Sequence, residues 1–299
     1  MNIISPITGT SSTKIIRSMP SSVLIEGYMK SSGIDVSKFF EGVEEIHRVK
    51  CLETDYEFAY PKVLGDGDFY DQLEKSSDFS YYYKELKWEH LLTEKYIKDE
   101  DKVLEIGFGK GSFLEHLHGK GIDCFGIEIN DAEVENLKSK SLKVACEPLE
   151  KHTEKGHKYD VIITYHVIEH VYEISEFFNN CKALLNKGGK LIFAVPNNES
   201  FLQYDKNNIL NNPPHHCGFW KTSSIPKVAK YFGFKMNVVK NSTLLAENVL
   251  WYTRVQFMRF GFSPSYDNFI FKLASKFISK FRNKLEGDAL FTVLIKEID

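Results

Sequence analysis

A glycine-rich turn, Glu105-Ile106-Gly107-Phe108-Gly109-Lys110-Gly111, follows a short apolar run and precedes a helical pattern. Alternate glycines give a tight turn without β-carbons, so a ligand can approach the backbone closely. Glu128 stands at the end of the next apolar run, where a carboxylate in Rossmann-type sites accepts hydrogen bonds from ribose hydroxyls. The two features together predict a ligand that carries a nucleoside.

The glycine spacing disfavours a dinucleotide. The pattern is G-x-G-x-G, and Ser112 stands where the dinucleotide fingerprint would place its third glycine. Glu105 would also repel a pyrophosphate, whereas a ligand with an ammonium and a sulfonium has reason to tolerate a carboxylate there. A NAD-linked oxidoreductase is therefore the weaker alternative.

Histidines are the candidate bases, because an imidazole with a pKa near roughly 6.5 can accept a proton at neutral pH. The candidates are His166, His170, His215 and His216. For His170 we favour a structural hydrogen bond or cap. His215 and His216 follow two prolines at the expected carboxyl edge of the sheet, and either a base or a purely structural role is open for them. We expect no metal site, because adjacent histidines beside Cys217 chelate awkwardly.

Elements of an α/β fold must position these groups. From about Asp101 onward, short apolar runs alternate with helical patterns, which is typical of βαβ units and a parallel sheet. Strands are expected at 102–107, 124–129, 142–147, 159–165, 190–196, 234–241 and 289–296. A helix over 172–186 is expected to end at Gly188-Gly189, which reads as a C-cap.

The chain divides into two expected parts. Residues 1–79 form a small accessory module in which Asp66-Gly67-Asp68 marks a turn, and residues 80–299 form the catalytic domain. A helix at about 80–98 leads into the first strand of the domain. An insertion at about 244–287 separates the last two strands.

The second half of that insertion, 269–285, is apolar at helical spacing and carries several lysines. A basic amphipathic helix can lie on an anionic membrane surface. We give more weight to a helix that packs on its own domain, as a lid or as a homodimer contact, because amphipathic helices generally serve the fold. All three roles stay open.

Bulk properties exclude several classes. A formal net charge of −3 gives no electrostatic footprint for nucleic acid. The five cysteines are odd in number and scattered, which fits a reducing cytoplasm better than a disulfide framework. The first residues show no signal-peptide pattern, and no run of eighteen apolar residues occurs. We therefore expect a cytoplasmic protein that acts on a small molecule.

Four motifs, in order, resemble those of class I S-adenosylmethionine methyltransferases of the ubiquinone-biosynthesis-like and sugar-modifying branches. They are VLEIGFGKGSFLEHL, FGIEIN, DVIITYHVIEHV and LLNKGGKLI. The resemblance implies a Rossmann-like seven-stranded sheet of order 3-2-1-4-5-7-6 with the last strand antiparallel. It also implies S-adenosyl-L-methionine as the cofactor.

The resemblance assigns expected roles to individual residues. Those expected around the methionine part of the cofactor are Glu105, Gly107, Phe108, Gly109 and Gly111. Glu128 would bind the ribose diol, Ile129 would flank the adenine, and Glu147 or Leu149 would lie near its amino group. Tyr165 and His166 would close the pocket, and one aromatic residue of the preceding helix, Tyr83, would touch the cofactor.

Two further segments resemble parts of these families. PPHH-x-x-x-W segments such as Pro213 to Trp220 line the acceptor pocket in the relatives. Ser5 to Gly9 and Cys51 to Thr54 look like eroded C-x-x-C pairs of an N-terminal zinc ribbon, and Cys51 alone cannot build a tetrahedral site. We therefore expect O-methylation, or less favourably N-methylation, of a sugar, nucleotide-sugar or other small polar metabolite. A non-catalytic or membrane-recruited binding protein is a further alternative.

Overall fold

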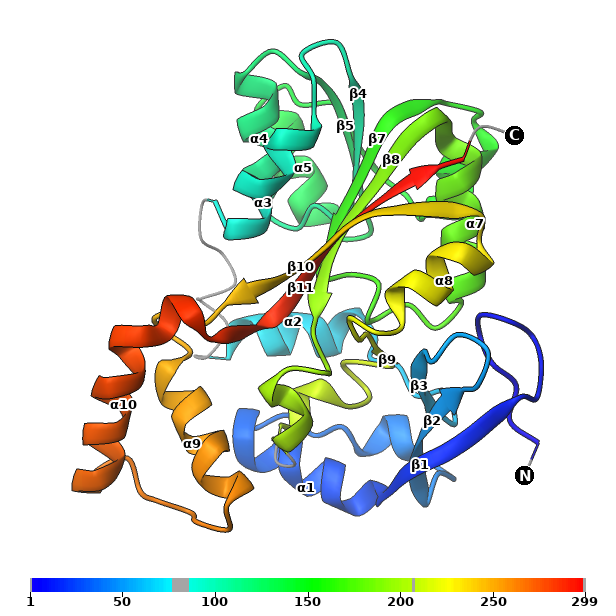
Figure 1. Cartoon of the computed structure of the whole chain (residues 1–299). Coiled ribbons are helices and arrows are strands. Elements are labelled where there is room, and N and C mark those ends of the chain that lie inside the picture. The colour runs from blue at the N-terminus through cyan, green and yellow to red at the C-terminus, as the bar shows by residue number, and fades with distance from the viewer. Residues whose placement is uncertain (1, 77–85, 206–207, 298–299) are drawn as a thin grey trace.

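The computed structural model describes residues 2–76, 86–205 and 208–297. Its larger sheet has seven strands in the order β10-β11-β8-β7-β4-β5-β6 (Figure 1). Their bounds are β4 Lys102–Ile106, β5 Asp123–Glu128, β6 Val144–Cys146, β7 Tyr159–Tyr165, β8 Leu185–Pro196, β10 Phe234–Thr243 and β11 Glu286–Lys296. In chain order this is 3-2-1-4-5-7-6, and β11 runs antiparallel to both neighbours. The expected α/β fold and strand order are confirmed.

Helices cover both faces of this sheet. One face holds α3 (Trp88–Thr93), α4 (Ser112–Gly119) and α5 (Asp131–Ser139), and the other holds α6 (Leu149–Glu154), α7 (Ile174–Leu184) and α8 (Ile225–Tyr231). Successive strand residues alternate between two apolar cores, so that Val103 packs with the first set and Leu104 with the second. Burial on both faces explains why these strands read as continuous apolar runs.

The helix expected over 172–186 ends earlier than its glycines suggested. α7 stops at Leu184, and β8 begins at the next residue. Tyr159 pairs with Leu185, but Val161 pairs with Lys190, so the residues between form a bulge in which Gly188 has a φ of 72°. The glycine pair therefore serves a β-bulge and not a helix C-cap.

The N-terminal residues form a second sheet, of order β1-β2-β3-β9. Its strands are β1 Thr13–Pro20, β2 Glu45–Cys51, β3 Glu57–Tyr60 and β9 Gly218–Phe219. The last of these comes from the chain that follows β8, and it pairs with Glu57 and Phe58 of β3. The accessory sheet is thus completed by a segment of the catalytic part.

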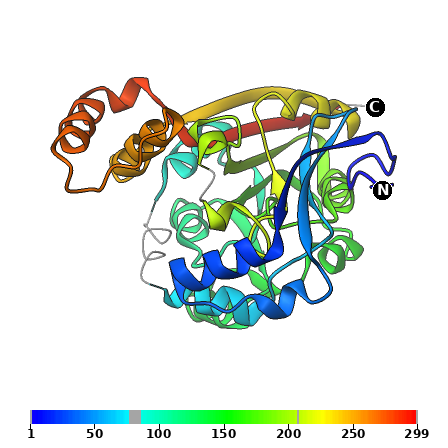
Figure 2. The ribbon, with the colours of Figure 1, turned by 90° about the horizontal axis from the view of Figure 1, so that it is seen from below.

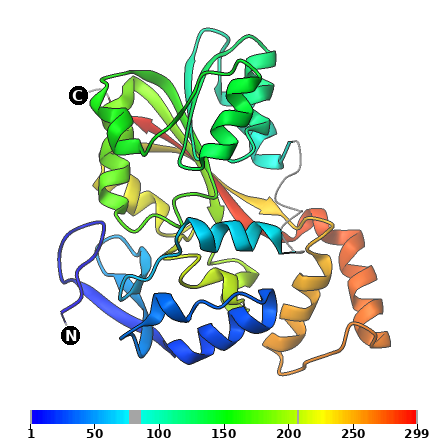
Figure 3. The ribbon, with the colours of Figure 1, turned by 180° about the vertical axis from the view of Figure 1, so that it is seen from behind.

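Helices of the N-terminal part lie beside the carboxyl ends of the parallel strands (Figure 3). They are α1 (Ser21–Ser32), α2 (Gly67–Lys75) and the 3-10 turn η1 (Ser37–Phe40). Asp66 does not mark a turn between strands, because its side chain accepts from Phe69 N at 2.9 Å and begins α2. One apolar core joins α1, α2 and Phe219, whereas Val49 and Phe58 belong to the core under α7 and α8.

The insertion before β11 is a helical hairpin of α9 (Val249–Arg259) and α10 (Phe269–Phe281). Figure 2 shows it projecting from one end of the molecule. Short 3-10 turns complete the chain: η3 Glu94–Tyr96, η4 Phe201–Tyr204, η5 Ile209–Asn211 and η6 Arg282–Lys284. No helix among the described residues is long and apolar enough to cross a bilayer.

Candidate active site

The glycine loop joins β4 to α4 through three residues with positive φ, at 69° for Gly107, 52° for Gly109 and 74° for Gly111. At Gly111 a β-carbon would lie 2.2 Å from Cδ1 of Leu137, so helix packing demands glycine. At Gly109 nothing lies within 4 Å of the same position. The loop is therefore packed at its helix end and open at its tip, where a ligand can meet the backbone.

Glu128 lies against this open tip. Its carboxylate accepts from Gly109 N at 3.0 Å and from Ile129 N at 2.7 Å. Oε1 also accepts from Asn130 N at 3.3 Å, so Oε2 is the oxygen with a lone pair left for a ribose hydroxyl. The side chain of Ile129 is 76% exposed and offers an apolar surface beside the carboxylate. The predicted cofactor roles of both residues are compatible with these positions.

Three buried carboxylates surround the end of β4 and β7. Glu89, Glu105 and Glu169 are each less than 5% exposed. Among the described residues, both oxygens of Glu89 and Oε2 of Glu105 and Glu169 accept no hydrogen bond. Burial, together with the charge of Glu128, raises the pKa of Glu105 to about 8. Lys87 and His166 balance part of this charge, and the carboxyl of Glu105, which His166 does not contact, favours a cationic ligand at this position.

His166 lies between two of these carboxylates, with Nε2 at 3.5 Å from Glu89 and Nδ1 at 3.4 Å from Glu169. Its backbone is left-handed, with φ at 55°. Burial alone would lower its pKa, but the flanking carboxylates raise it to about 9. An imidazole that is already protonated at neutral pH cannot accept a proton there. The geometry therefore fits a buried cation better than the catalytic base we expected at His166.

Other predicted cofactor residues have partners within the protein. The hydroxyl of Tyr165 donates to Thr93 Oγ1 at 2.6 Å, and its ring packs on Phe113. Phe108 is buried below the loop, in the core on the α4 side. Glu147 holds His152 at 2.7 Å and also pairs with Lys155. Leu149, the alternative to Glu147, is core, and Tyr83 lies outside the described residues.

A cluster of three histidines lies next to His166. Nδ1 of His170 lies 2.7 Å from the backbone oxygen of His215, Nδ1 of His215 lies 3.0 Å from Leu210 O, and Nδ1 of His216 lies 3.1 Å from Asn211 Oδ1. A carbonyl oxygen only accepts, so in the neutral imidazole each Nδ1 carries the proton and Nε2 carries the lone pair. His170 thus serves as the structural hydrogen-bond donor that we favoured.

The two adjacent histidines differ in position. His215 is 7% exposed, whereas His216 is partly open and senses the charge of His166. Burial, with the charge of neighbouring histidines, lowers the pKa of both well below the ordinary value. Both are neutral at physiological pH. Of the pair, His216 is the more exposed.

One ring nitrogen from each of His170, His215 and His216 lies within 4.8 Å of the others. A zinc–imidazole bond is about 2.0–2.1 Å, so these nitrogens would have to move closer to share an ion. The rings of His215 and His216 are stacked, with an interplanar angle of 22°. That this part of the protein binds no metal stays a prediction.

A family model described as a methyltransferase domain matches residues 80–239, more than half of the chain. The chain belongs to this family. A ubiquinone biosynthesis O-methyltransferase of Coxiella burnetii is 28% identical over 101 residues, which cover 32% of this chain and 43% of the relative. The same-named protein of Acinetobacter baumannii is 27% identical over 108 residues, covering 32% and 44%. The chain thus spans less than half the length of these relatives.

A solved S-adenosylmethionine-dependent methyltransferase of Archaeoglobus fulgidus has the same fold, with a TM-score of 0.53 at 18% identity over 77% of this chain and all of the other. A Pyrococcus horikoshii protein aligns at 0.50 and 16% identity over 78% of this chain and its own full length. The expected membership of a methyltransferase family and the expected fold are confirmed, and the family argues against the NAD-linked oxidoreductase.

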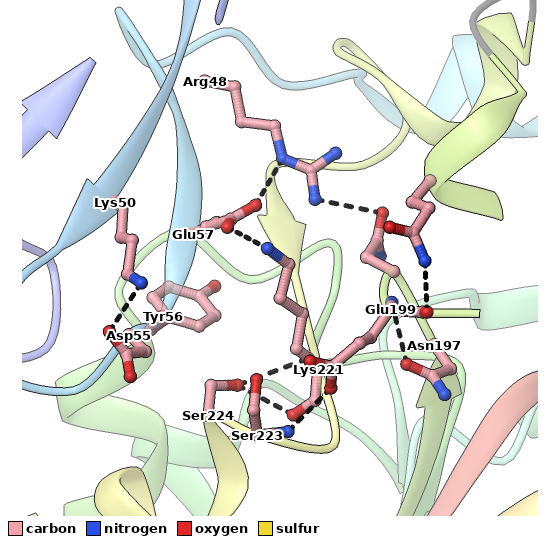
Figure 4. Close-up of polar contacts among 12 residues, drawn as sticks. Arg48, Lys50, Asp55, Tyr56, Glu57, Asn197, Glu199, Lys221, Ser223 and Ser224 are labelled. Atoms are coloured by element: carbon pink, nitrogen blue, oxygen red, sulfur yellow. Dashed lines mark hydrogen bonds and ion pairs between the residues drawn. The ribbon is translucent and has the colours of Figure 1, made fainter. Parts of the chain in front are cut away.

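A polar network joins the accessory sheet to the segments that follow β8 (Figure 4). Glu57, 2% exposed, is held by Arg48 at 2.7 Å and by Lys221. Arg48 also lies 4.1 Å from the ring centre of Phe219 and donates to Asn198 Oδ1 at 3.4 Å. That amide oxygen accepts from Asn211 at 2.8 Å. Because Asn211 in turn holds His216, the two parts of the molecule share one network.

The eroded zinc-ribbon pairs also meet. Oγ1 of Thr8 lies 3.8 Å from Sγ of Cys51. Hydrogen bonds from Ser5 and Thr54 lower the pKa of the Cys51 thiol, although burial opposes this. The two segments that we compared with a zinc ribbon therefore lie together, and hydroxyls and one thiol meet between them. The prediction that this corner holds no zinc stays a prediction.

Sequence reasoning missed several residues of the methyltransferase site. Glu169 is three residues after His166, and this i,i+3 spacing was a readable signal for an ion pair in the turn. Glu89 lies in the Trp88-Glu89-His90 segment, where no sequence pattern indicated a contact with His166. The link from Glu57 through Asn198 and Asn211 had no local signal, because its members are far apart in the chain.

Proposed function

We propose that this protein is an S-adenosylmethionine-dependent O-methyltransferase that uses His216 as the base. The observation that carries the proposal is the buried Oε2 of Glu105, which has no hydrogen-bond partner and lies four residues before the open tip of the glycine loop. A ligand with a nucleoside, an ammonium and a sulfonium matches a ribose-binding carboxylate, an open backbone turn and a buried negative group together. The fold and family support the same cofactor.

When bound, the cofactor supplies an activated methyl group on a sulfonium. Glu128 would hold the ribose of the cofactor, and Glu105 would hold its cationic end. His166, fixed between Glu89 and Glu169, keeps two carboxylates apart and balances part of their charge. In-line transfer mainly requires alignment of acceptor and donor, which these fixed groups provide.

His216 would remove the acceptor proton. Its Nδ1 is held by Asn211, so the lone pair on Nε2 can accept from a hydroxyl. A lowered pKa keeps this imidazole neutral, and therefore competent to accept, even in moderately acidic solution. His215 would position His216 through ring stacking at 4.4 Å between centroids.

The acceptor we propose is a sugar, a nucleotide-sugar or another small polar metabolite. Asn197 and Asn198, both buried, follow β8 at the same edge as His216 and Arg48, which gives this side a polar character. The matched relatives are named O-methyltransferases, which supports oxygen over nitrogen as the acceptor atom. We also propose that the protein is cytoplasmic and has no nucleic-acid partner.

Two measurements test it in turn. Calorimetry should show binding of S-adenosylhomocysteine and no binding of NAD, and the reverse result would exclude the proposed cofactor. A methyl-labelled donor should then transfer its label to a hydroxyl of one compound in a panel of sugars, nucleotide-sugars and phenols. Mass spectrometry would identify the labelled compound and the labelled position. If the cofactor binds but no acceptor is labelled while the enzyme is folded, a non-catalytic binding protein is the better description.

A further inference from the structure

Charge is unevenly distributed along this chain. Residues 249–284, which form the α9–α10 hairpin with η6, contain seven Lys or Arg residues and one acidic residue, Asp267. The hairpin is therefore formally +6, although the whole chain is −3. The remaining residues carry a formal charge of −9. A basic element on an acidic protein is a local electrostatic feature that the net charge conceals.

Helix α10 carries an apolar stripe that no part of the described chain covers. Its members are Phe269, Ile270, Leu273, Phe277 and Phe281, with exposed fractions from 43% to 77%. At 3.6 residues per turn these positions share one side of the helix. Phe271 and Ser275 on the opposite side are buried and pack toward α9. The hairpin thus uses one face for folding and leaves a second apolar face in solvent.

Lysines border the exposed stripe. Lys272, Lys276 and Lys280 repeat every four residues and form a row directly beside it, and all three are exposed. At the tip of the hairpin, Phe260 and Phe262 are 72% and 64% exposed. Aromatic and aliphatic side chains next to a row of lysines form the pattern of helices that lie in a membrane interface, with lysine ends at the level of lipid phosphates.

We propose that the α9–α10 hairpin docks the protein on the surface of an anionic lipid bilayer. The apolar stripe and the tip aromatics would enter the boundary between headgroups and acyl chains, and the lysine row would contact phosphates. A second copy of the chain is a poorer occupant, because a symmetric contact through this face would bring two hairpins of formal charge +6 together. A lid over the site is also a poorer explanation of the exposed face, because the hairpin projects from the rest of the molecule (Figure 2).

The base of the hairpin adjoins the site. Asn248, which precedes α9, donates to Asp288 at 3.1 Å, and the backbone oxygen of Asp288 accepts from Asn197 N at 2.7 Å. Docking would therefore set the carboxyl edge of the sheet at a defined orientation to the bilayer. Membrane binding itself does not depend on methyl transfer, so the two proposals can fail separately.

Vesicle flotation of the full chain tests the inference. We expect binding to phosphatidylglycerol-containing vesicles, weak binding to pure phosphatidylcholine, and release by salt. Each lysine near an anionic surface contributes about fivefold in affinity, so the triple variant Lys272→Gln, Lys276→Gln, Lys280→Gln should bind roughly a hundredfold more weakly. Leu273→Ser with Phe277→Ser should also lose binding. Lys14→Gln, Lys30→Gln, Lys151→Gln, at exposed positions elsewhere, is the matched control.

Three outcomes would overturn the inference. These are no flotation of the wild-type protein, equal loss of binding in the control variant, or binding that ignores both salt and lipid charge. Analytical ultracentrifugation tests whether a second copy of the chain covers the stripe instead. A wild-type dimer that dissociates in the Leu273→Ser, Phe277→Ser variant would assign the stripe to a second copy. Unchanged S-adenosylhomocysteine binding in each variant shows that the protein is folded.

Discussion

Nδ1 of His216 donates to Oδ1 of Asn211 across 3.1 Å, and this bond sets which ring nitrogen carries the proton. The amide nitrogen of Asn211 donates to Asn198, which fixes the orientation of the amide and keeps its oxygen toward the imidazole. The tautomer of the proposed base is thus determined by two asparagines from the loops after β8. His215, although adjacent, is held by the backbone at Leu210 instead.

We predict that His216→Asn lowers kcat by about 10²–10⁴-fold, the usual range for removal of a general base. S-adenosylhomocysteine affinity should stay within about twofold. Asn211→Leu should give a smaller loss of kcat and shift the acidic limb of the pH profile, because the imidazole keeps its place but loses its fixed tautomer. His215→Asn is the comparison variant, and a larger kcat loss there than in His216→Asn would reverse the assignment.

Glu105 should make cofactor affinity depend on pH. Its pKa of about 8 means that it holds a proton in the ligand-free protein at neutral pH, whereas a cationic ligand favours the carboxylate. Binding should then release a proton, and affinity should rise by up to about tenfold per pH unit toward pH 8. Calorimetry in buffers of different ionisation enthalpy measures the proton. Glu105→Gln should bind more weakly and without this dependence.

The same carboxyl should affect stability in the opposite direction. Because the pKa of Glu105 is raised in the folded protein, the protonated carboxyl contributes fully to the free energy of unfolding below about pH 4.5. This contribution is lost as pH rises toward about 8. The free energy of unfolding of the ligand-free protein should therefore fall across this window, measured by urea titration. Glu105→Gln should flatten the decline, and an unchanged slope would show that another group is responsible.

Two glycines of the loop should separate folding from binding. Gly111→Ala places a β-carbon against Leu137 at a φ of 74°, and should cost about 2–4 kcal/mol in the free energy of unfolding. Gly109→Ala meets open space and should cost only about 1–2 kcal/mol for its backbone conformation, yet weaken cofactor binding at least tenfold. Thermal unfolding and calorimetry measure both. Equal losses of stability in the two variants would contradict the finding that the loop is packed at Gly111 and open at Gly109.

Loss of the buried Glu57 should destabilise the protein. Arg48 and Lys221 are 21% and 25% exposed, so Glu57→Gln should cost about 3 kcal/mol, at the lower end of the range for broken buried pairs. Lys50→Gln at the more exposed Asp55 pair is the matched control, and should cost less than about 1 kcal/mol. Similar losses for both variants would show that burial does not strengthen the Glu57 pairs.

The sheet could be predicted from the sequence because its strands are buried on both faces and read as apolar runs between helical patterns. Glu105 and Glu128 could be placed for the same reason, as each ends such a run. The end of α7 could not, since Gly188-Gly189 suits a helix cap and a β-bulge equally, and strand pairing chose the bulge. Only tertiary contacts distinguish these two uses of glycine.

The environments of several predicted site residues could not be read from the sequence, and the reasons are physical. Tyr165 and Phe108 occupy motif positions, but their side chains pack in the apolar core on the α4 side of the sheet. His166 was predicted as a base from its ordinary pKa, which two carboxylates distant in sequence or one turn away have raised. Charge environment is a property of the folded chain, and local patterns do not report it.

The pairing of β9 with β3 has a consequence for any attempt to recombine this enzyme. A fragment that begins near residue 80 would carry Gly218 and Phe219 without their partner strand, and a fragment that ends there would leave the edge of β3 open for aggregation. The N-terminal part is therefore not an exchangeable cassette. Grafting a relative's module would also require residues 218–219 to be replaced. Because Gly218 lies two positions after His216, a change of module would also alter the acceptor site that we propose.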